Sequence, residues 1–364
     1  MVKEMTHLER GVATLNNEPV DHLASYPLAC GVCRRLVGEG NMTYRDWASD
    51  PKKFASAFIE GQKKYGFDLA VGLMDLSVMA GDLGAHVRMD EQNTPFVDGH
   101  LPHTPEAYES MEVPDIKKGR TNVLIEGTEI FTKALKNEVV CASFIEGPLL
   151  ALSQSVGAED LFMDMFDCPE AVHKALQTMT DYDMQIINEF GKIDGLSAVC
   201  WDYLWGNYAC LGDDEYHEFE AQYANKLNDR VRETGKASTV HNCADLPHLD
   251  TQIKEYKSAL FSFAYYPQIE GSPSAADVID QGYCDICTMV GAVDPQVFMR
   301  NTAEETAKIT GDLCQEVKTS LCKRGLKSRF VISSGCEVPP GIECRMDNIE
   351  AFVKATAQYG KMEY

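Results

Sequence analysis

The sequence predicts an α/β protein, a (β/α)8 TIM barrel with an N-terminal helical extension and an active site at the C-terminal ends of its strands. Three observations predict it: eight short apolar runs, helical patterns between them, and polar residues directly after several runs. Buried parallel strands are continuously apolar, and strands separated by helices imply crossover units. A chain of 364 residues suits one such barrel, so we expect a single domain over residues 1–364.

Each predicted element has a local signal. A first helix begins at Thr6-His7-Leu8-Glu9, which has the pattern of a capping box. Another begins at Asp50-Pro51 and ends at Gly66, and a third runs from Pro169 with apolar residues near a 3.6-residue period. The eight apolar runs predict strands at 23–28, 69–74, 139–145, 197–201, 237–240, 259–263, 286–290 and 330–333.

Composition and charge exclude several classes of function. The net charge of −23 argues against nucleic acid or an anionic membrane as a partner. No apolar stretch approaches the roughly 20 residues of a membrane span, and residues 1–5 lack the apolar core of a secretory signal. We therefore expect a cytoplasmic protein. The odd number of cysteines, 13, then favours reduced thiols, and we interpret the Cys30/Cys33 and Cys284/Cys287 pairs as plain thiols.

One imidazole and two thiols follow predicted strands. His241 and Cys243 come after the fifth run and Cys336 after the eighth. Side chains at i and i+2 of a strand point the same way, and the carboxyl ends of all barrel strands meet at one rim. Three such ligands with a fourth position free are typical of catalytic zinc. The sequence thus predicts a zinc site, with a strand-end histidine beside two buried thiols as the alternative.

Acidic and aromatic residues follow other runs. Asp75, Glu146 and Asp202 come after the second, third and fourth runs, and we expect them to orient substrate or a zinc ligand, with helix capping or a structural salt bridge as the alternative. Aromatic side chains are expected to face the mouth and bind an aromatic substrate, although half of them would pack into the core if they behave as most aromatics do. The six predicted substrate-binding residues are Trp201, Tyr203, Trp205, Phe263, Tyr265 and Tyr266.

Several polar residues receive a plainer interpretation. We expect Glu220 to lie exposed on a helix, with a place within reach of the site as the alternative, and His217 and His248 to lie at the surface. Arg34 and Arg35 follow the first strand, where a solvated pair is the simplest reading and contact with an anionic substrate the alternative.

The chain resembles the uroporphyrinogen decarboxylase superfamily and, within it, the zinc- and corrinoid-dependent methyltransferases. The resemblance covers nearly the whole chain, and its specific part is the His-x-Cys and later Gly-Cys, which look like the zinc ligands of that branch. The motifs that carry it are 6–10, 18–21, Asp75-Leu76-Ser77 with Gly84, 145–148, His241-Asn242-Cys243 and 334–340.

The resemblance implies a methyltransferase in which zinc acts as a Lewis acid. A methyl group would move between a small methyl donor or acceptor and the cobalt of a methylcobamide or cobalamin on a separate corrinoid protein. The sequence lacks the Asp-x-His-x-x-Gly motif that binds a corrinoid. Asp75 matches the superfamily's catalytic aspartate. We favour an aromatic methyl ether as substrate, as in O-demethylase components; the alternatives are a coenzyme M type thiol methyltransferase, a porphyrinogen decarboxylase and a non-catalytic partner of a corrinoid protein.

Two departures from the pattern leave the fourth zinc ligand open. Ala244-Asp245 follows Cys243 where the coenzyme M enzymes usually have Gly-Asn, and Ala264-Tyr265-Tyr266 stands where they carry an acidic pair. The oligomeric state stays open as well, with a homodimer among the options.

Overall fold

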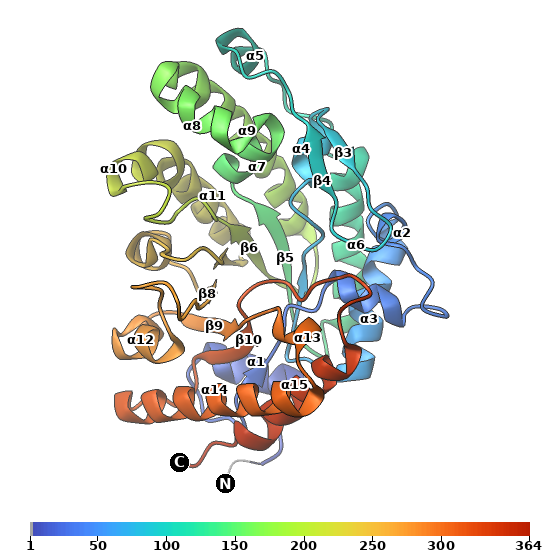
Figure 1. Ribbon diagram of the computed structural model, residues 1–364, viewed down its shortest axis with the longest axis vertical. Coiled ribbons are helices and arrows are strands. Elements are labelled where there is room, and N and C mark those ends of the chain that lie inside the picture. The colour runs from blue at the N-terminus through green and yellow to red at the C-terminus, as the bar shows by residue number, and fades with distance from the viewer. Residues whose placement is uncertain (1–2) are drawn as a thin grey trace.

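The computed structural model describes residues 3–364 and contains a barrel of eight parallel strands. All eight predicted strands are confirmed in order, and the fold class with them (Figure 1). The strands are β1 (Ala24–Ser25), β2 (Leu69–Gly72), β5 (Val140–Glu146), β6 (Leu196–Asp202), β7 (Ala237–Asn242), β8 (Leu260–Phe263), β9 (Thr288–Val293) and β10 (Phe330–Ser334).

The barrel is nearly closed. Its strand order is β1-β10-β9-β8-β7-β6-β5-β2, so β1 and β2 lie at the two ends of the sheet. The backbone N–H of Asp68 donates to Ser25 O at 3.0 Å, and that of Val71 donates to the Tyr26 hydroxyl at 3.2 Å. A backbone bond and a tyrosine side chain thus bridge the position where a full ladder would close the ring.

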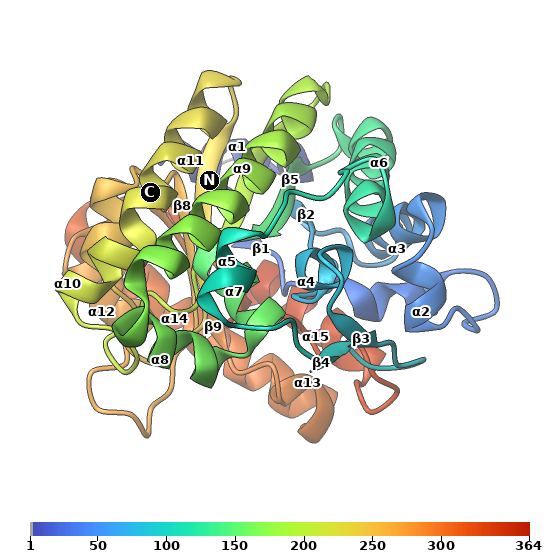
Figure 2. The same cartoon turned by 90° about the horizontal axis from the view of Figure 1, so that it is seen from above.

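Helices surround the strands (Figure 2). The predicted start of the first helix is confirmed, because Thr6 and Glu9 form a capping box, and the second predicted helix ends at Gly66 in the left-handed conformation with φ 66°. The long helices are α1 (His7–Leu15), α3 (Pro51–Tyr65), α6 (Gly119–Leu135), α9 (Pro169–Lys192), α11 (Gln222–Glu233), α14 (Ala303–Arg324) and α15 (Met346–Tyr359).

Shorter elements lie between the strands and these helices. They are α2 (Tyr44–Trp47), α4 (Val78–Asp82), the hairpin of β3 (His86–Arg88) and β4 (Phe96–Gly99), α5 (Pro105–Glu109), α7 (Pro148–Val156), α8 (Ala158–Asp167), α10 (Asp213–Tyr216), α12 (Ala275–Asp280) and α13 (Val297–Arg300), with single 3₁₀ or π turns at Gly31–Leu36, His217–Ala221, Asp250–Glu255 and Tyr283–Asp285. Most lie between a barrel strand and the long helix that follows it, so they add to the carboxyl rim of the barrel, where a TIM barrel places its site.

The two ends of the described chain lie side by side (Figure 1). Leu23 N–H donates to Gly360 O at 2.9 Å, and His22 and Lys361 form an isolated antiparallel bridge. Among the described residues, no helix has both the length and the apolar character needed to cross a membrane.

Candidate metal centre at the barrel mouth

Strand register places the predicted polar residues on one inward-facing row. Glu146 is the Cα partner of Asp202, Asp202 of His241, and His241 of Ser262, across four adjacent strands. Glu146 and Asp202 are the last residues of their strands, and His241 lies one residue before the end of β7. Because side chains alternate between the two faces of a strand, all four point into the barrel near its mouth.

The two thiols join this row from the strand exits. One ligand atom each from His241, Cys243 and Cys336 lies within 4.8 Å of the other two, a spacing that can hold a metal ion. Gly335 makes this approach possible, because a Cβ there would lie 2.8 Å from Ala264 Cα and clash with the exit of β8. The chain leaving β10 therefore passes directly against the chain leaving β8, and Cys336 comes to face Cys243.

The pKa values of the three side chains are shifted in different directions. A hydrogen bond from Cys243 and another from His241 hold the pKa of the Cys336 thiol well below its usual range. The contact with Cys336 and burial raise the pKa of Cys243 well above its usual range. Burial alone would lower the pKa of His241, but the hydrogen bond to Cys336 and the charge of Asp202 raise it. Cys336 is thus the thiolate of the pair, as a soft metal ligand must be.

Neighbouring residues fix the orientation of the cluster. His241 Nδ1 lies 3.0 Å from Ser262 Oγ. The Phe144 ring packs beside the imidazole with its centroid 5.7 Å away. The Tyr266 hydroxyl donates to Cys243 O at 2.8 Å, and burial together with the charges of Cys243 and Cys336 raises the pKa of Tyr266 to about 12. Partners of this kind orient metal-binding side chains in many proteins.

The three predicted acids lie at the mouth, in different states. Asp75 is buried in an ion pair with Arg120 and accepts from Ser77 N–H at 3.0 Å. Burial, together with the charges of Asp75 and Asp202, raises the pKa of Glu146 well above its usual range. Burial also raises the pKa of Asp202 to about 7, against the opposing charge of His241. Burial thus favours the protonated forms of Glu146 and Asp202, whereas Asp75 is paired with Arg120.

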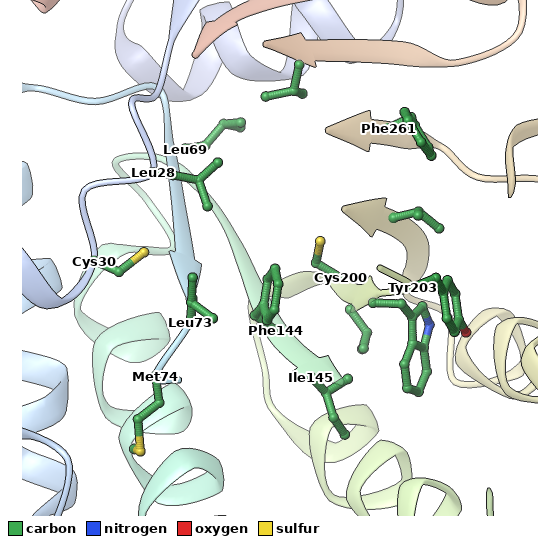
Figure 3. Packing of buried hydrophobic residues seen from close by; sticks show 14 of the residues in the cluster. Leu28, Cys30, Leu69, Leu73, Met74, Phe144, Ile145, Cys200, Tyr203 and Phe261 are labelled. Atoms are coloured by element: carbon green, nitrogen blue, oxygen red, sulfur yellow. The ribbon is translucent and has the colours of Figure 1, made fainter. Parts of the chain in front are cut away.

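The structure corrects the predicted aromatic wall. Trp201 and Tyr203 stack on each other with 0% exposure, and Phe263 is equally buried against Phe330. Trp201 and Phe263 alternate with the inward-facing Asp202 and Ser262, so they point toward the surrounding helices. Figure 3 shows Tyr203 on that outer side as well. These three side chains belong to the core, in agreement with the alternative that half of the six aromatic residues pack there.

The other three aromatic residues lie nearer the mouth. Tyr266 contacts Cys243, Tyr265 is 36% exposed, and Trp205 donates from Nε1 to Ser153 Oγ at 2.8 Å while packing edge-on against Phe162. The aromatic surface that a substrate could contact is thus smaller than the sequence suggests.

The expectations for four further residues are corrected. Glu220 is fully buried rather than exposed, and His248 is buried, with Nε2 2.9 Å from Leu211 O. Arg34 and Arg35 are not a solvated pair. Arg34 donates to Pro340 O at 2.6 Å, and Arg35 to Gly341 O at 2.9 Å. Both arginines therefore hold the loop that follows Cys336.

Two residues of the site were missed in the sequence. Arg120 lies 45 positions from Asp75 and stands in a Lys-Lys-Gly-Arg segment that looks like solvated surface. Glu337 accepts from Gly31 N–H at 2.9 Å, and burial raises its pKa to about 8. Its place directly after Cys336 is the signal that could have found it.

Comparison with known proteins supports the family resemblance of the sequence. Residues 6–359 match the family described as uroporphyrinogen decarboxylase (URO-D). The chain is 20% identical over 246 residues to the methylcobamide:CoM methyltransferase MtbA of Methanosarcina mazei, which is 66% of this chain and 71% of that protein. It is 23% identical over 269 residues to a uroporphyrinogen decarboxylase of Anaeromyxobacter dehalogenans, 69% of this chain and 74% of that protein.

A solved structure supports the fold. A methyltransferase from Methanosarcina mazei superposes with a TM-score of 0.80 and 18% identity, over 98% of this chain and 99% of the other. At that identity the superposition demonstrates the same barrel, with its helices in the same arrangement.

Proposed function

The chain belongs to the uroporphyrinogen decarboxylase (URO-D) family, and on that premise we propose that it is a methyltransferase that moves a methyl group between a small substrate and the cobalt of a corrinoid on a separate protein. The observation that carries this proposal is the convergence of His241, Cys243 and Cys336 within 4.8 Å at the barrel mouth. The similarity to a methylcobamide:CoM methyltransferase supports it.

The donor set fits zinc. One imidazole and two thiols are ligands that Zn²⁺ prefers, and three protein ligands leave a fourth position for a reactant. Nδ1 of His241 faces Ser262, so Nε2 is the ring nitrogen available toward the thiols. When bound, zinc would lower the pKa of a thiol or polarise an ether oxygen.

The surrounding residues orient the reactant and supply protons. Asp202 and Glu146, which burial keeps protonated to higher pH, can donate a proton or a hydrogen bond to an oxygen or sulfur atom at the mouth. Asp75 is paired with Arg120 and can accept a hydrogen bond from the same reactant. Tyr266 holds the backbone at Cys243 through the hydrogen bond from its hydroxyl.

Two substrate classes fit this arrangement. We favour an aromatic methyl ether, because Tyr265, Tyr266 and Trp205 offer aromatic surface near the mouth. A small thiol acceptor is the second candidate, favoured by the similarity to the methylcobamide:CoM methyltransferase of Methanosarcina mazei. Both reactions need the same three metal ligands, so the ligands do not decide between them.

Metal analysis tests the metal-dependent reaction against porphyrinogen decarboxylation, which needs no metal. We expect about one zinc per chain in the purified protein, and loss of zinc together with methyl transfer in Cys336→Ser. Cys322→Ser changes an exposed thiol on α14 and serves as the matched control. Methyl transfer by a Cys336→Ser protein that keeps its fold would contradict the proposal.

A substrate screen separates the two classes. The zinc-loaded protein is mixed with cobalt(I) cobalamin and a series of methoxy-aromatic compounds, or with methylcobalamin and a series of thiols, and the visible spectrum of the corrinoid is followed. We expect methyl-cobalt to form with at least one aromatic ether. Demethylation of methylcobalamin by thiols alone would assign the protein to the second class.

A further inference from the structure

The inside of the barrel is hollow below the candidate metal centre. A cavity of about 270 Å³ is lined by residues of seven of the eight strands or their flanks, together with the end of α1. In most TIM barrels, layers of bulky branched side chains fill this space. Figure 3 shows Leu28, Leu69, Phe144 and Cys200 grouped around it.

Small residues on adjacent strands create the cavity. The inward positions of β5, β6 and β7 that pair with one another hold Ala142, Ala198 and Ala237, where valine or isoleucine would fill the barrel. The exposed fractions of the side chains confirm that the inner face of the strands borders the cavity. Ala142 is 9% exposed and Ala198 7%, whereas the outward-facing Val199 between the inner positions is 0%.

The cavity opens at the amino-terminal end of the strands. Asn16, Ser197 and Ala259 line that end and are exposed, whereas Phe144 and His241 line the far end and are buried. The imidazole and the Phe144 ring separate the cavity from the two thiols, because neither Cys243 nor Cys336 lines it. Its entrance and the proposed methyl-transfer site therefore lie at opposite ends of the barrel.

The chemistry of the lining selects a neutral, apolar occupant. Among residues 3–364, no lysine, arginine, aspartate or glutamate lines the cavity. The polar groups in its interior already have partners: Thr239 Oγ1 donates to Val199 O at 3.2 Å, Ser262 Oγ contacts His241 Nδ1, and Tyr26 is bonded at its hydroxyl to Val71. A charged ligand would be desolvated there without compensation.

We propose that this cavity binds a small uncharged apolar molecule, about the size of one substituted aromatic ring, which enters from the amino-terminal end of the barrel. The size follows from the volume, since in another protein a cavity of about 150 Å³ lined by apolar side chains binds benzene. The site goes beyond the proposed methyl transfer and does not depend on it. An occupant would contact Phe144 and His241 from below, on the face of the imidazole turned away from the thiols.

Thermal unfolding with a defined probe tests the site. Toluene serves as the probe and benzoate as a charged molecule of similar size. A ligand that binds the folded state alone raises the unfolding midpoint. We expect toluene to raise the midpoint by a few degrees in a concentration-dependent manner, and benzoate to leave it unchanged.

Variants in which the cavity is filled test whether toluene binds inside the barrel. Ala198→Leu fills the cavity and should abolish the response to toluene, whereas Ala209→Leu, the same change at an exposed position, should keep it. If Ala198→Leu does not fold, Ala142→Val fills part of the same space with a smaller change. Xenon-pressurised crystals of the unmodified protein should show density inside the barrel. A toluene response that persists when the cavity is filled, or a cavity that takes up neither toluene nor xenon, would overturn the proposal.

Discussion

His241 and Ser262 are register partners on β7 and β8, and their side chains meet at 3.0 Å between Nδ1 and Oγ. This one contact fixes how the imidazole presents itself to the thiols. The ring nitrogen that faces Ser262 lies away from Cys336, so the other nitrogen is left to the metal position. The strand register, which also pairs His241 with Asp202 on the other side, thus determines the chemistry available at the mouth.

We predict that Ser262→Ala weakens zinc binding by about 10- to 100-fold, the usual cost of removing a residue that orients a metal-binding histidine. Competition with a chromophoric chelator measures the affinity. Ser262→Thr keeps a hydroxyl at the same position and should bind zinc nearly as the unmodified protein does. Equal affinities in the alanine and threonine variants would show that the contact with Ser262 does not orient His241.

Zinc affinity should also rise with pH. Metal binding requires thiolates, and contact with Cys336 raises the pKa of Cys243, so this thiol must release its proton when zinc binds. We expect about a tenfold gain in affinity per pH unit below the pKa of Cys243. Chelator competition between pH 6 and 8 at constant ionic strength measures the slope. An affinity that is constant over this range would mean that both sulfurs are already ionised.

The order of the barrel strands could be predicted from the sequence because parallel strands leave long apolar runs. The same apolar runs do not show whether an individual side chain points into the barrel or toward the helices. Trp201 stands between Cys200, which lines the cavity, and Asp202 at the mouth, yet all three lie in one buried strand. Since both faces of such a strand are buried, an apolar run does not show which residues point inward. For this reason the sequence predicts Trp201 and Tyr203 at the mouth, whereas the structure buries both in the core.

Long-range polar partners were equally hidden. Asp75 and Arg120 come from opposite ends of the insertion after β2, and no local pattern links them. Glu220 stands in a π turn, His217–Ala221, where the helical period shifts and an expected exposed face turns inward. The convergence of His241, Cys243 and Cys336 could be predicted because their spacing and strand-end positions are themselves local features.

A double-mutant cycle tests how much the Arg120–Asp75 ion pair contributes to the free energy of unfolding. Arg120→Met leaves the buried Asp75 carboxylate unpaired, and we expect a loss of about 3–5 kcal/mol in the free energy of unfolding. Adding Asp75→Asn to Arg120→Met should restore much of the loss. Urea unfolding measures stability, and the rate of methyl transfer by Asp75→Asn alone shows whether the carboxylate also acts on the substrate. Equal stability of Arg120→Met and the double variant would argue against a structural role for the pair.

Glu220 should make the protein less stable as pH rises. Burial raises the pKa of its carboxyl well above the unfolded value of 4.5, and neither oxygen has a hydrogen-bond partner among the described residues. Below pH 4.5 both states are protonated. Above it the unfolded state loses the proton while the folded state keeps it, so unfolding becomes easier by up to about 1.4 kcal/mol per pH unit until the folded carboxyl ionises as well.

Glu220→Gln removes this dependence because a neutral amide occupies the same space. We expect the variant to gain stability over the unmodified protein step by step between pH 5 and pH 8, in urea unfolding at several pH values. Glu218→Gln, on the same π turn with a side chain 55% exposed, should follow the unmodified protein throughout. Parallel curves for Glu220→Gln and the unmodified protein would mean that the buried carboxyl finds a compensating charge or ionises near its ordinary pKa.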